Sequence, residues 1–336
     1  MPCDGQGPMA MMPSSAEIER AAAILRGGGL VAFPTETVYG LGADARNPEA
    51  VARIFEVKGR PQDHPLIVHL PGTGHLDRWA REVPALARTL ARAFWPGPLT
   101  LIVERAQGVP DAVTGGQNTV GLRVPSHPVA QALLRAFAGE EGERRFDGVA
   151  APSANRFGRI SPTTAAHVRA DLGGDVAMIL DGGACAVGIE STIVDCSRGD
   201  PVLLRPGAIT AEQIALAAGI APRPADAEAP RAPGALASHY APSRPLMLIA
   251  AAQWDSALAQ IRARRAVLSL REQPPGDTSA RWIQMSSDAV RAGHDLYADL
   301  RVLDGCDCEL ILVEAPPPGP QWDGVRDRLS RAATRS

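Results

Sequence analysis

One short stretch, FEVKGRPQDHPLIVH at residues 55–69, carries four side chains that could bind an anion: Lys58, Arg60, His64 and His69. Lysine and arginine together number 34 in the 336-residue chain, and Lys58 is the only lysine among them. A lysine ammonium is a compact charge on a flexible stem, whereas a guanidinium is a wide planar fork. A crowded phosphate site would therefore require lysine at position 58. Compositional drift is the alternative, and cations at a helix C-terminus also complement the helix dipole without binding anything.

Two further blocks combine polar side chains with strands. FPTETVYGLGADA at residues 33–45 packs threonines, a glutamate, a tyrosine and glycines into a predicted turn, which suits either a structural loop or the polar rim of a small-ligand site. NTVGLRVPSHP at residues 118–128 places Arg123 in an apolar strand, with its side chain pointing away from Leu122 and Val124. Both a solvated outer face and a ligand site fit this position.

The remaining blocks are weaker signals. APSANRFGRISPTTAAHV at residues 151–168 has small polar residues and a predicted helix start at Ser161-Pro162. Helix N-termini bind phosphate through backbone N–H groups, although many bind nothing. GIESTIVDC (188–196) and LLRPGAIT (203–210) each place a charged or hydroxyl residue at the edge of a strand. The sequence has neither a Walker motif nor a G-x-G-x-x-G loop, so a nucleotide would bind without the common glycine loops.

The elements that must position these blocks indicate a mixed α/β sheet. A helix is expected from Ser14, with Glu17 completing a capping box, and Asn47-Pro48 should open a second helix that ends at Lys58-Gly59. Strands are predicted at LVAF, PLIVHL, LTLIVE, TVGLRV, VAMIL, STIVD and PVLL, and helices near 84–95, 128–138, 162–172 and 210–218. Several strands follow one another without a helix, which excludes a regular parallel sheet.

Two domains are expected. The first should span residues 14–220, behind a disordered N-terminus at 1–13. Residues 221–245 are rich in alanine and proline, a composition typical of a semi-extended linker. From residue 246 to 336, predicted strands alternate with helices near 288–301 and 322–333, as in a small Rossmann-like parallel α/β domain.

Composition restricts the classes of function. A net charge of −3 argues against a large non-specific nucleic-acid surface, although a local basic pocket stays open. The five cysteines suit neither a disulfide framework nor a zinc site, so we expect reduced thiols and no metal site; a soft-metal site at Cys306 and Cys308 is the weaker alternative. The N-terminus lacks a basic start and a long apolar run, so neither a signal peptide nor a membrane anchor is predicted, and a cytoplasmic location is expected.

Taken together, the blocks resemble one family. KGRP with PLIVH, FPTETVYGLG, SAN followed by SPT, ESTIVD and LRPG, all within residues 30–210, resemble the YrdC-like family of threonylcarbamoyl-AMP synthases. The linker with SHYAP and the C-terminal α/β segment resemble the longer, two-domain form of that family. The resemblance implies a twisted mixed α/β domain with a large basic concave site.

The resemblance also implies a reaction. L-Threonine, bicarbonate or carbon dioxide, and ATP would give threonylcarbamoyl-AMP and pyrophosphate, which makes the protein a nucleotidyltransferase. ATP would be a substrate accompanied by Mg²⁺, and no bound organic cofactor is implied. A separate transferase complex would carry the threonylcarbamoyl group to the adenosine beside the anticodon of tRNA, and the enzyme's own contact with tRNA would be weak.

The positions of the matching motifs imply a site with two ends, one for threonine and one for ATP. The threonine end would be lined by Thr37, His69, Arg123, Ala151 and Ser191. ATP would be bound by Lys58, Arg60, His64, Thr119, Ser153, Asn155, Ser161, Arg205 and Tyr240. Lys58 and Arg60 would be the catalytic cations, Arg123 would bind the threonine carboxylate because guanidinium contacts carboxylate bidentately, and Tyr240 would fold back over the site as a gate.

The sequence departs from the family pattern at two places. His64 stands where asparagine is usual before PLI, so nucleotide affinity would acquire a pH dependence. The tail GPQWDGVRDRLSRAA keeps only part of the expected glycine and alanine pattern. Two rival hypotheses share the fold: a YrdC-like module that binds structured RNA without catalysis, and a carbamoyl-transfer domain of hydrogenase-maturation proteins, whose acylphosphatase-like and zinc-finger segments this chain lacks.

Overall fold

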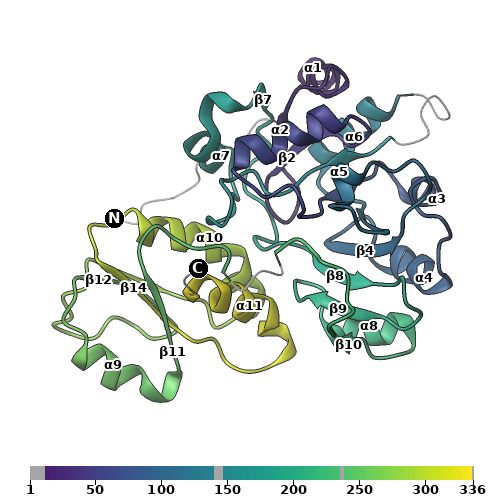
Figure 1. Ribbon diagram of the computed structural model, residues 1–336. Coiled ribbons are helices and arrows are strands. Elements are labelled where there is room, and N and C mark those ends of the chain that lie inside the picture. Colours follow the sequence, from purple (N-terminus) through teal and green to yellow (C-terminus); the bar gives the residue numbers. More distant parts are fainter. Residues whose placement is uncertain (1–11, 140–146, 235–237, 335–336) are drawn as a thin grey trace.

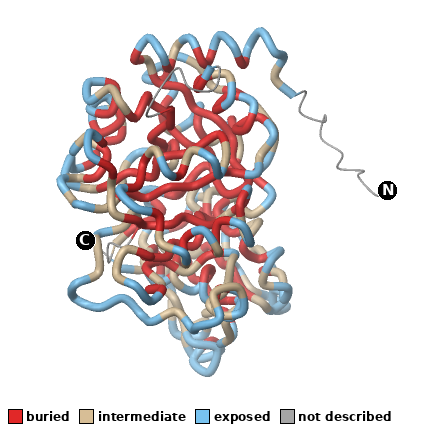
Figure 2. Tube along the Cα trace, turned by 90° about the vertical axis from the view of Figure 1, so that its right-hand side faces the viewer, coloured by how far each residue is buried: buried red, intermediate tan, exposed pale blue. Residues whose placement is uncertain are grey.

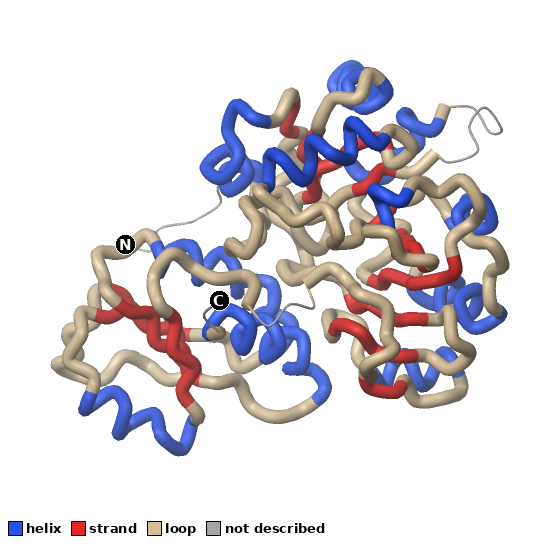
Figure 3. Tube along the Cα trace, in the orientation of Figure 1, coloured by secondary structure: helices blue, strands red, loops and turns tan. Residues whose placement is uncertain are grey.

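The computed structural model describes residues 12–139, 147–234 and 238–334, so the expected disordered N-terminus lies almost wholly outside the described residues. The described chain forms a larger and a smaller α/β domain, each built on its own sheet (Figures 1 and 3). The larger sheet is mixed and the smaller one is parallel, which confirms the predicted fold class.

The large sheet has ten strands in the order β10-β9-β8-β4-β5-β3-β6-β2-β1-β7. Its strands are β1 (Val31–Phe33), β2 (Gly40–Asp44), β3 (Ile67–His69), β4 (Leu99–Glu104), β5 (Thr119–Arg123), β6 (Val149–Ala150), β7 (Met178–Ile179), β8 (Thr192–Asp195), β9 (Val202–Arg205) and β10 (Arg223–Pro224). Parallel pairing of β3 with β5 places His69 directly beside Arg123. Parallel pairing of β4 with β8 brings the ESTIVD segment into the same sheet.

Helices cover both faces of this sheet. They are α1 (Ser15–Arg26), α2 (Pro48–Lys58), α3 (Leu76–Trp79), α4 (Ala85–Phe94), α5 (Asp111–Thr114), α6 (Pro128–Ala138), α7 (Ala165–Leu172) and α8 (Ala211–Ala218). Helices α1 and α6 share one core with Val31 and Phe33, whereas α2, α4 and α8 contribute to the main core. The predicted caps are confirmed: Ser14 and Glu17 form a capping box, and Asn47 caps α2, which ends at Lys58 before the left-handed Gly59.

The second domain is a four-stranded parallel sheet in the order β11-β14-β12-β13. Its elements are β11 (Leu246–Ile249), α9 (Trp254–Gln260), β12 (Arg265–Ser269), β13 (Arg281–Gln284), α10 (Ala289–Asp304), β14 (Leu310–Glu314) and α11 (Asp323–Ala333). Trp254 of α9 packs on one face with Val267 and Leu312. Helices α10 and α11 cover the other face of this sheet. Their buried side chains also belong to a core that includes residues of the first domain.

One hydrophobic core runs across the boundary between the domains. It unites Leu296 and Leu329 of the second domain with Ile160 and Ile189 of the first and with Tyr240 of the linker. In Figure 2 the buried segments lie in the interior of both domains, with exposed segments around them. The two domains are therefore packed against each other rather than joined by the linker alone.

Two local predictions differ from the structure. Residues 40–44, expected within a turn, form strand β2, because Gly42 lets β1 and β6 approach: a Cβ there would lie 2.8 Å from the Phe33 ring and 2.9 Å from Val149. The helix expected from Ser161-Pro162 begins instead at Ala165, because the Thr164 hydroxyl accepts from the N–H of His167 and so caps it.

No helix in the described part of the chain combines the length and the apolar character that crossing a membrane requires.

Candidate active site

A cavity of about 50 Å³ lies among the ends of β3, β5, β8 and β9, beneath the linker. It is lined by all five residues predicted for the threonine end, namely Thr37, His69, Arg123, Ala151 and Ser191. Of those predicted for ATP, it is lined by Arg60, Ser153, Arg205 and Tyr240. The fold thus brings most of the predicted site residues to one place, although they are spread over some two hundred positions of sequence.

Arg123, predicted from its strand position, points inward and is buried. Its Nη1 donates to the hydroxyl of Thr37 at 2.9 Å, and its Nη2 lies 2.7 Å from the carboxylate of Glu36. The solvated-face alternative for Arg123 is therefore wrong. The hydroxyl and the carboxylate fix the orientation of the guanidinium, which lines the cavity.

His69 lies beside Arg123 in the neighbouring strand and is also buried. Burial, followed by the positive charge of Arg123, lowers the pKa of His69 to about 3. The imidazole is therefore neutral at physiological pH, and its ring packs edge-on against Phe33. A neutral ring here acts as a hydrogen-bonding wall rather than as a cation.

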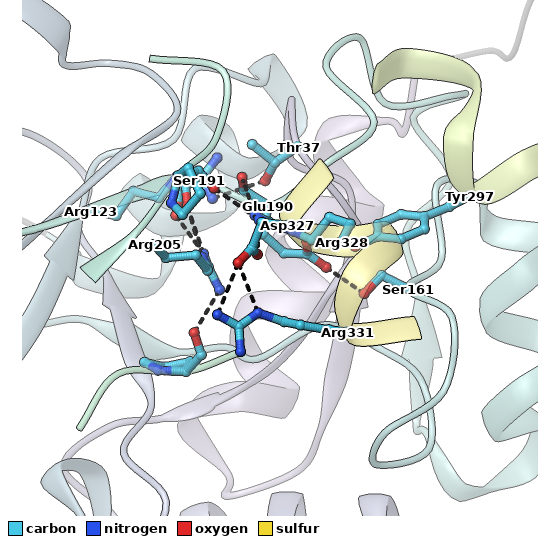
Figure 4. Close-up of polar contacts among 12 residues, drawn as sticks. Thr37, Arg123, Ser161, Glu190, Ser191, Arg205, Tyr297, Asp327, Arg328 and Arg331 are labelled. Atoms are coloured by element: carbon cyan, nitrogen blue, oxygen red, sulfur yellow. Dashed lines mark hydrogen bonds and ion pairs between the residues drawn. The ribbon is translucent and has the colours of Figure 1, made fainter. Parts of the chain in front are cut away.

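Arg205 and Ser191 both line the cavity and are hydrogen-bonded to each other (Figure 4). Two nitrogens of Arg205 donate to the carbonyl of Ser191 at 3.0 and 2.8 Å, and Nη2 also reaches the Ser191 hydroxyl at 3.1 Å. Nη1 donates to the carbonyl of Pro233 at 2.9 Å. Burial lowers the pKa of Arg205 below its usual value.

Lys58 lies behind the cavity wall rather than in it. Its Nζ donates to the carbonyl of Ser153 at 2.6 Å and also to the carbonyl of Asn155. Burial, with repulsion from Arg60, holds the pKa of Lys58 well below its usual range. The amide of Asn155 in turn donates to the carbonyls of Arg156 and Arg159, both at 2.8 Å, so the SAN loop and Lys58 form one hydrogen-bonded unit.

Arg60 separates this cavity from a second, more apolar one of about 170 Å³. The aromatic walls of the second cavity are Phe157, His64 and His239, with ring centroids of the two histidines 5.5 and 5.8 Å from that of Phe157. Arg60 donates to the carbonyl of Pro65 at 2.8 Å and lies 5.9 Å from the Phe157 ring. Burial lowers the pKa of Arg60 to about 10.

Lys58, Arg60 and Arg205 thus form a buried cationic cluster. Within the described part of the chain, their hydrogen bonds go to carbonyls and hydroxyls, and none is in an ion pair with a carboxylate. Buried charges are normally paired, because desolvation penalises an isolated ion. Burial is the main cause of the lowered pKa values of all three residues, and repulsion from a neighbouring arginine adds to it in each case. The site is arranged to receive an anion.

Buried polar atoms without a hydrogen-bond partner also gather here. Among the described residues they include Nε of Arg60, Nδ1 of His69, Oδ1 of Asn155, Nδ1 of His239 and Oη of Tyr240. Buried polar groups in native proteins are nearly always satisfied, so a local concentration of unsatisfied atoms indicates a place where a ligand supplies the partners.

The linker closes the site. Tyr240 is 1% exposed and has a positive φ of 62°, and its ring lies 4.2 Å from that of His239. The cavity left beneath it is far smaller than the roughly 300–1,000 Å³ typical of small-molecule pockets. The described conformation is therefore a closed one.

Four residues predicted for ATP lie outside both cavities, namely Lys58, Thr119, Asn155 and Ser161, and one residue that lines the first cavity was missed. Thr119 begins β5 opposite Glu104 and is half-buried. Ser161 is buried and donates to the carboxylate of Glu190, which lines the cavity and was not singled out from the sequence. Glu190 stands in the ESTIVD segment, so the signal was its place directly before Ser191, and its buried partners were not readable from local sequence.

Comparisons with known proteins find relatives over nearly the whole chain. The family model named for Sua5, YciO and YrdC, described as telomere recombination, matches residues 23–207. A second model, described as threonylcarbamoyl-AMP synthase, C-terminal domain, matches residues 209–334. The threonylcarbamoyl-AMP synthase of Bacillus subtilis is 41% identical over 333 residues, which cover 94% of this chain and 93% of that protein.

Solved structures are similar over nearly the whole chain. Sua5 of Pyrococcus abyssi, crystallised with L-threonine, is 36% identical with a TM-score of 0.87 and covers 96% of each chain. A variant of the same protein, in which a histidine and the tyrosine after it are both alanine, is 35% identical with a TM-score of 0.86 and covers 95% of this chain and 93% of that one. The present sequence has one His-Tyr pair, His239-Tyr240.

Proposed function

Because the chain belongs to the Sua5/YciO/YrdC family, we propose that it joins L-threonine, bicarbonate or carbon dioxide, and ATP to give threonylcarbamoyl-AMP and pyrophosphate. It is a threonylcarbamoyl-AMP synthase, an ATP-using transferase, and this catalytic function is favoured over a non-catalytic RNA-binding module. L-Threonine and ATP are its substrates. The carbon source, the role of each residue and the fate of the product are proposed below.

The observation that carries the proposal is the buried cluster of Lys58, Arg60 and Arg205, which has no carboxylate partner among the described residues. The threonine amine captures carbon dioxide as a carbamate, a carbamate oxygen forms a bond to the α-phosphorus, and the bond from that phosphorus to the bridging oxygen breaks to release pyrophosphate. Negative charge accumulates on phosphate oxygens, so the step requires positioning and positive charge more than a general base.

The threonine end of the site is proposed to consist of Thr37, His69, Arg123, Ala151 and Ser191. Arg123 binds the threonine carboxylate in this proposal, because it faces the cavity and a guanidinium has donors for more than one acceptor. Its charge is shared with the carboxylate of Glu36, 2.7 Å away, and neutral His69 adds no second positive charge. The crystallised complex of P. abyssi Sua5 with L-threonine supports L-threonine as the ligand.

The nucleotide end is proposed to consist of Lys58, Arg60, His64, Thr119, Ser153, Asn155, Ser161, Arg205 and Tyr240. The adenine ring would stack in the cavity walled by Phe157, His64 and His239, because a purine binds between aromatic faces of that kind. The phosphates would then extend past Arg60 toward Arg205, with Mg²⁺ entering as part of the ATP substrate. Thr119 would have to be reached by a movement of the linker.

Tyr240 is proposed to act as a gate. It covers the cationic cluster in the closed state and would leave when ATP binds, because the remaining cavity of about 50 Å³ is too small for the triphosphate. We also propose the limits of the domains: a catalytic domain at 14–220, the linker at 221–245 and the second domain at 246–336. The product would pass, in the cytoplasm, to a transferase complex that modifies tRNA, with only weak binding of tRNA by this protein.

The test is pyrophosphate release from ATP by the purified protein, with threonine and bicarbonate added separately and together, and with serine as the control amino acid. Release that requires both co-substrates is expected. Release that does not depend on threonine would contradict the proposal, and salt-sensitive tRNA binding without any release would instead favour the RNA-binding module.

A further inference from the structure

A carboxylate that the proposed reaction leaves unused lies fully inside the site. Glu190 precedes β8, lines the cavity and is 7% exposed. Its side chain accepts from the hydroxyl of Ser161, from the hydroxyl of Tyr297 at 2.8 Å and from Nε of Arg328 at 2.9 Å (Figure 4). Tyr297 lies on α10 and Arg328 on α11, so two of the three partners come from the second domain.

Arg328 donates to two segments of the first domain and contacts the linker. Beyond the Glu190 carboxylate, Nη2 donates to the Glu190 carbonyl at 3.2 Å and Nη1 to the Pro206 carbonyl at 2.8 Å. Its guanidinium lies 5.3 Å from the centre of the Tyr240 ring. Asp327, which is itself bound by Arg331, also accepts from Nη1.

These contacts adjoin Arg205 of the nucleotide end and its hydrogen-bond partner Ser191, which is assigned to the threonine end. Glu190 directly precedes Ser191, and Pro206 directly follows Arg205, so Arg328 holds the backbone next to each partner of the Arg205–Ser191 pair. A single side chain from the second domain therefore fixes the spacing between β8 and β9 where that pair forms.

The two helices dock through glycines, which shows that the contact is close. A Cβ on Gly324 of α11 would lie 3.2 Å from the Cα of Gly207 and 2.8 Å from the Ile189 side chain. Gly188 has a φ of 82°, and a Cβ there would collide with the backbone of Gly293 and His294 in α10. Both sides of the boundary thus lack the side chains that would keep the helices away from Glu190 and Pro206.

We propose that Arg328 and Tyr297 are positioning residues for ATP: they hold Glu190, and through it the Arg205–Ser191 pair, in the geometry that receives the phosphates. The second domain then completes the nucleotide site of the first. This inference rests on the proposed assignment of Arg205 to the phosphates. The lowered pKa of Glu190, about 2 despite the opposing effect of burial, agrees with compensation by Arg328 and then Arg205.

The experiment uses the full chain and three variants. Arg328→Met removes every donor at similar length, Tyr297→Phe removes one hydroxyl without a change of shape, and Arg326→Met makes the same change at an exposed position of α11. Pyrophosphate release is measured against ATP and against threonine, ATP and threonine binding are measured by titration calorimetry, and thermal unfolding verifies folding.

Arg328→Met is expected to raise the KM and Kd for ATP about tenfold or more while the Kd for threonine stays within about twofold. Tyr297→Phe should raise the KM for ATP about threefold, and Arg326→Met should match the parent. An equal loss of affinity for ATP and for threonine, together with a lower Tm, would show a merely structural role and overturn the inference. So would an ATP affinity that is unchanged in both Arg328→Met and Tyr297→Phe.

The pH profile provides a readout that a structural role would not move. Glu190 is faced by Ser161, Arg205, Tyr240, Tyr297 and Arg328, with His239 nearby. Without Arg328 its carboxyl should take up a proton at higher pH, so the acid limb of kcat/KM for ATP should move upward in Arg328→Met, by less in Tyr297→Phe, and not in Arg326→Met. Coincident profiles would count against the inference. A parent that releases no pyrophosphate would refute the proposed function instead, and calorimetry with ATP would still decide between the variants.

Discussion

At the scale of single residues, Lys58 shows what a site can require of one side chain. Its ammonium fits between the carbonyls of Ser153 and Asn155, which it ties to the end of α2. An ammonium presents three donors in a tetrahedral arrangement, whereas a guanidinium presents a flat fork of greater width. The sequence hypothesis of a crowded phosphate site and the observed carbonyl contacts both require the compact group.

Lys58→Arg is therefore expected to lower kcat/KM for ATP by about 100-fold, because the larger fork must displace the SAN loop from the site. Pyrophosphate release checks the rate, and circular dichroism checks that the variant folds. Lys58→Met, which keeps the length and removes the charge, is the comparison. A folded Lys58→Arg enzyme that turns over at the parent rate would leave compositional drift as the explanation.

The burial of His69 and His239 leads to a prediction of how the free energy of unfolding depends on pH. The pKa of His69 is lowered from 6.5 to about 3, so between these values the unfolded chain binds more protons than the folded one. The free energy of unfolding should therefore fall as the pH falls from about 6.5 toward 3, and burial of His239, with a pKa also of about 3, adds to this loss.

Urea denaturation at several pH values between 7.5 and 4.5 measures this slope. In His69→Gln the residue that titrates is gone, so the decline below pH 6.5 should be shallower than in the parent. An identical slope in the two proteins would show that His69 is not the source.

Much of the site was predictable at this scale because its residues stand in motifs that resemble those of one family. The strand position of Arg123 left a ligand site and a solvated face open, the LRPG motif made Arg205 a candidate through the resemblance, and both residues line the cavity. Glu190 and Arg328 were not predicted, because a carboxylate before a strand and an arginine in an amphipathic helix look solvated in sequence. Only the packing of α11 against residues 206 and 207 reveals that Glu190 and Arg328 are buried together.

At the scale of elements, the closed conformation of the linker depends on one glycine. Gly234 has a φ of 76°, and a Cβ there would collide with the hydroxyl of Tyr240 and lie 3.0 Å from Nη1 of Arg205. The closed position of Tyr240 therefore exists because residue 234 has no side chain.

Gly234→Ala is expected to displace Tyr240 from the site and to speed hydrogen exchange in residues 238–245 by about tenfold or more. Gly276→Ala is the matched control, since Gly276 has a similar φ of 79° and open space around it. Exchange that is equally slow in Gly234→Ala and the parent would contradict this account of closure.

Elements were predictable where periodicity and caps agree. The helices near 84–95, 128–138 and 210–218 are confirmed as α4, α6 and α8, and those near 288–301 and 322–333 as α10 and α11. Strand β2 was missed because glycines replace the β-branched residues that mark a strand. The two-residue strands β6 and β10 are defined by their partners rather than by their own sequence, so no local pattern could predict them.

At the scale of the whole molecule, the shared core makes the two domains one thermodynamic unit. Ile160 and Ile189 of the first domain pack with Leu296 and Leu329 of the second, and Arg301 of α10 forms an ion pair with Asp171 of α7. Burial across the boundary couples the unfolding of one domain to that of the other.

A single calorimetric transition is therefore expected for the full chain. Ile189→Ala should lower the free energy of unfolding by roughly 2–5 kcal/mol, as is usual for a buried isoleucine, and should lower the Tm of the whole transition. Two resolved transitions, of which only one shifts in the variant, would show that the domains unfold independently.

The closed linker has a consequence for affinity that no contact with ATP would reveal. A cavity of about 50 Å³ is too small for a triphosphate, so under the proposed gate role His239 and Tyr240 would act as an intramolecular competitor of the substrate. The observed ATP affinity then equals the intrinsic affinity multiplied by the fraction of molecules in which the competitor has dissociated. Substitutions in residues 221–245 would thus set the ATP concentration at which the enzyme works, while Lys58, Arg60 and Arg205 stay unaltered.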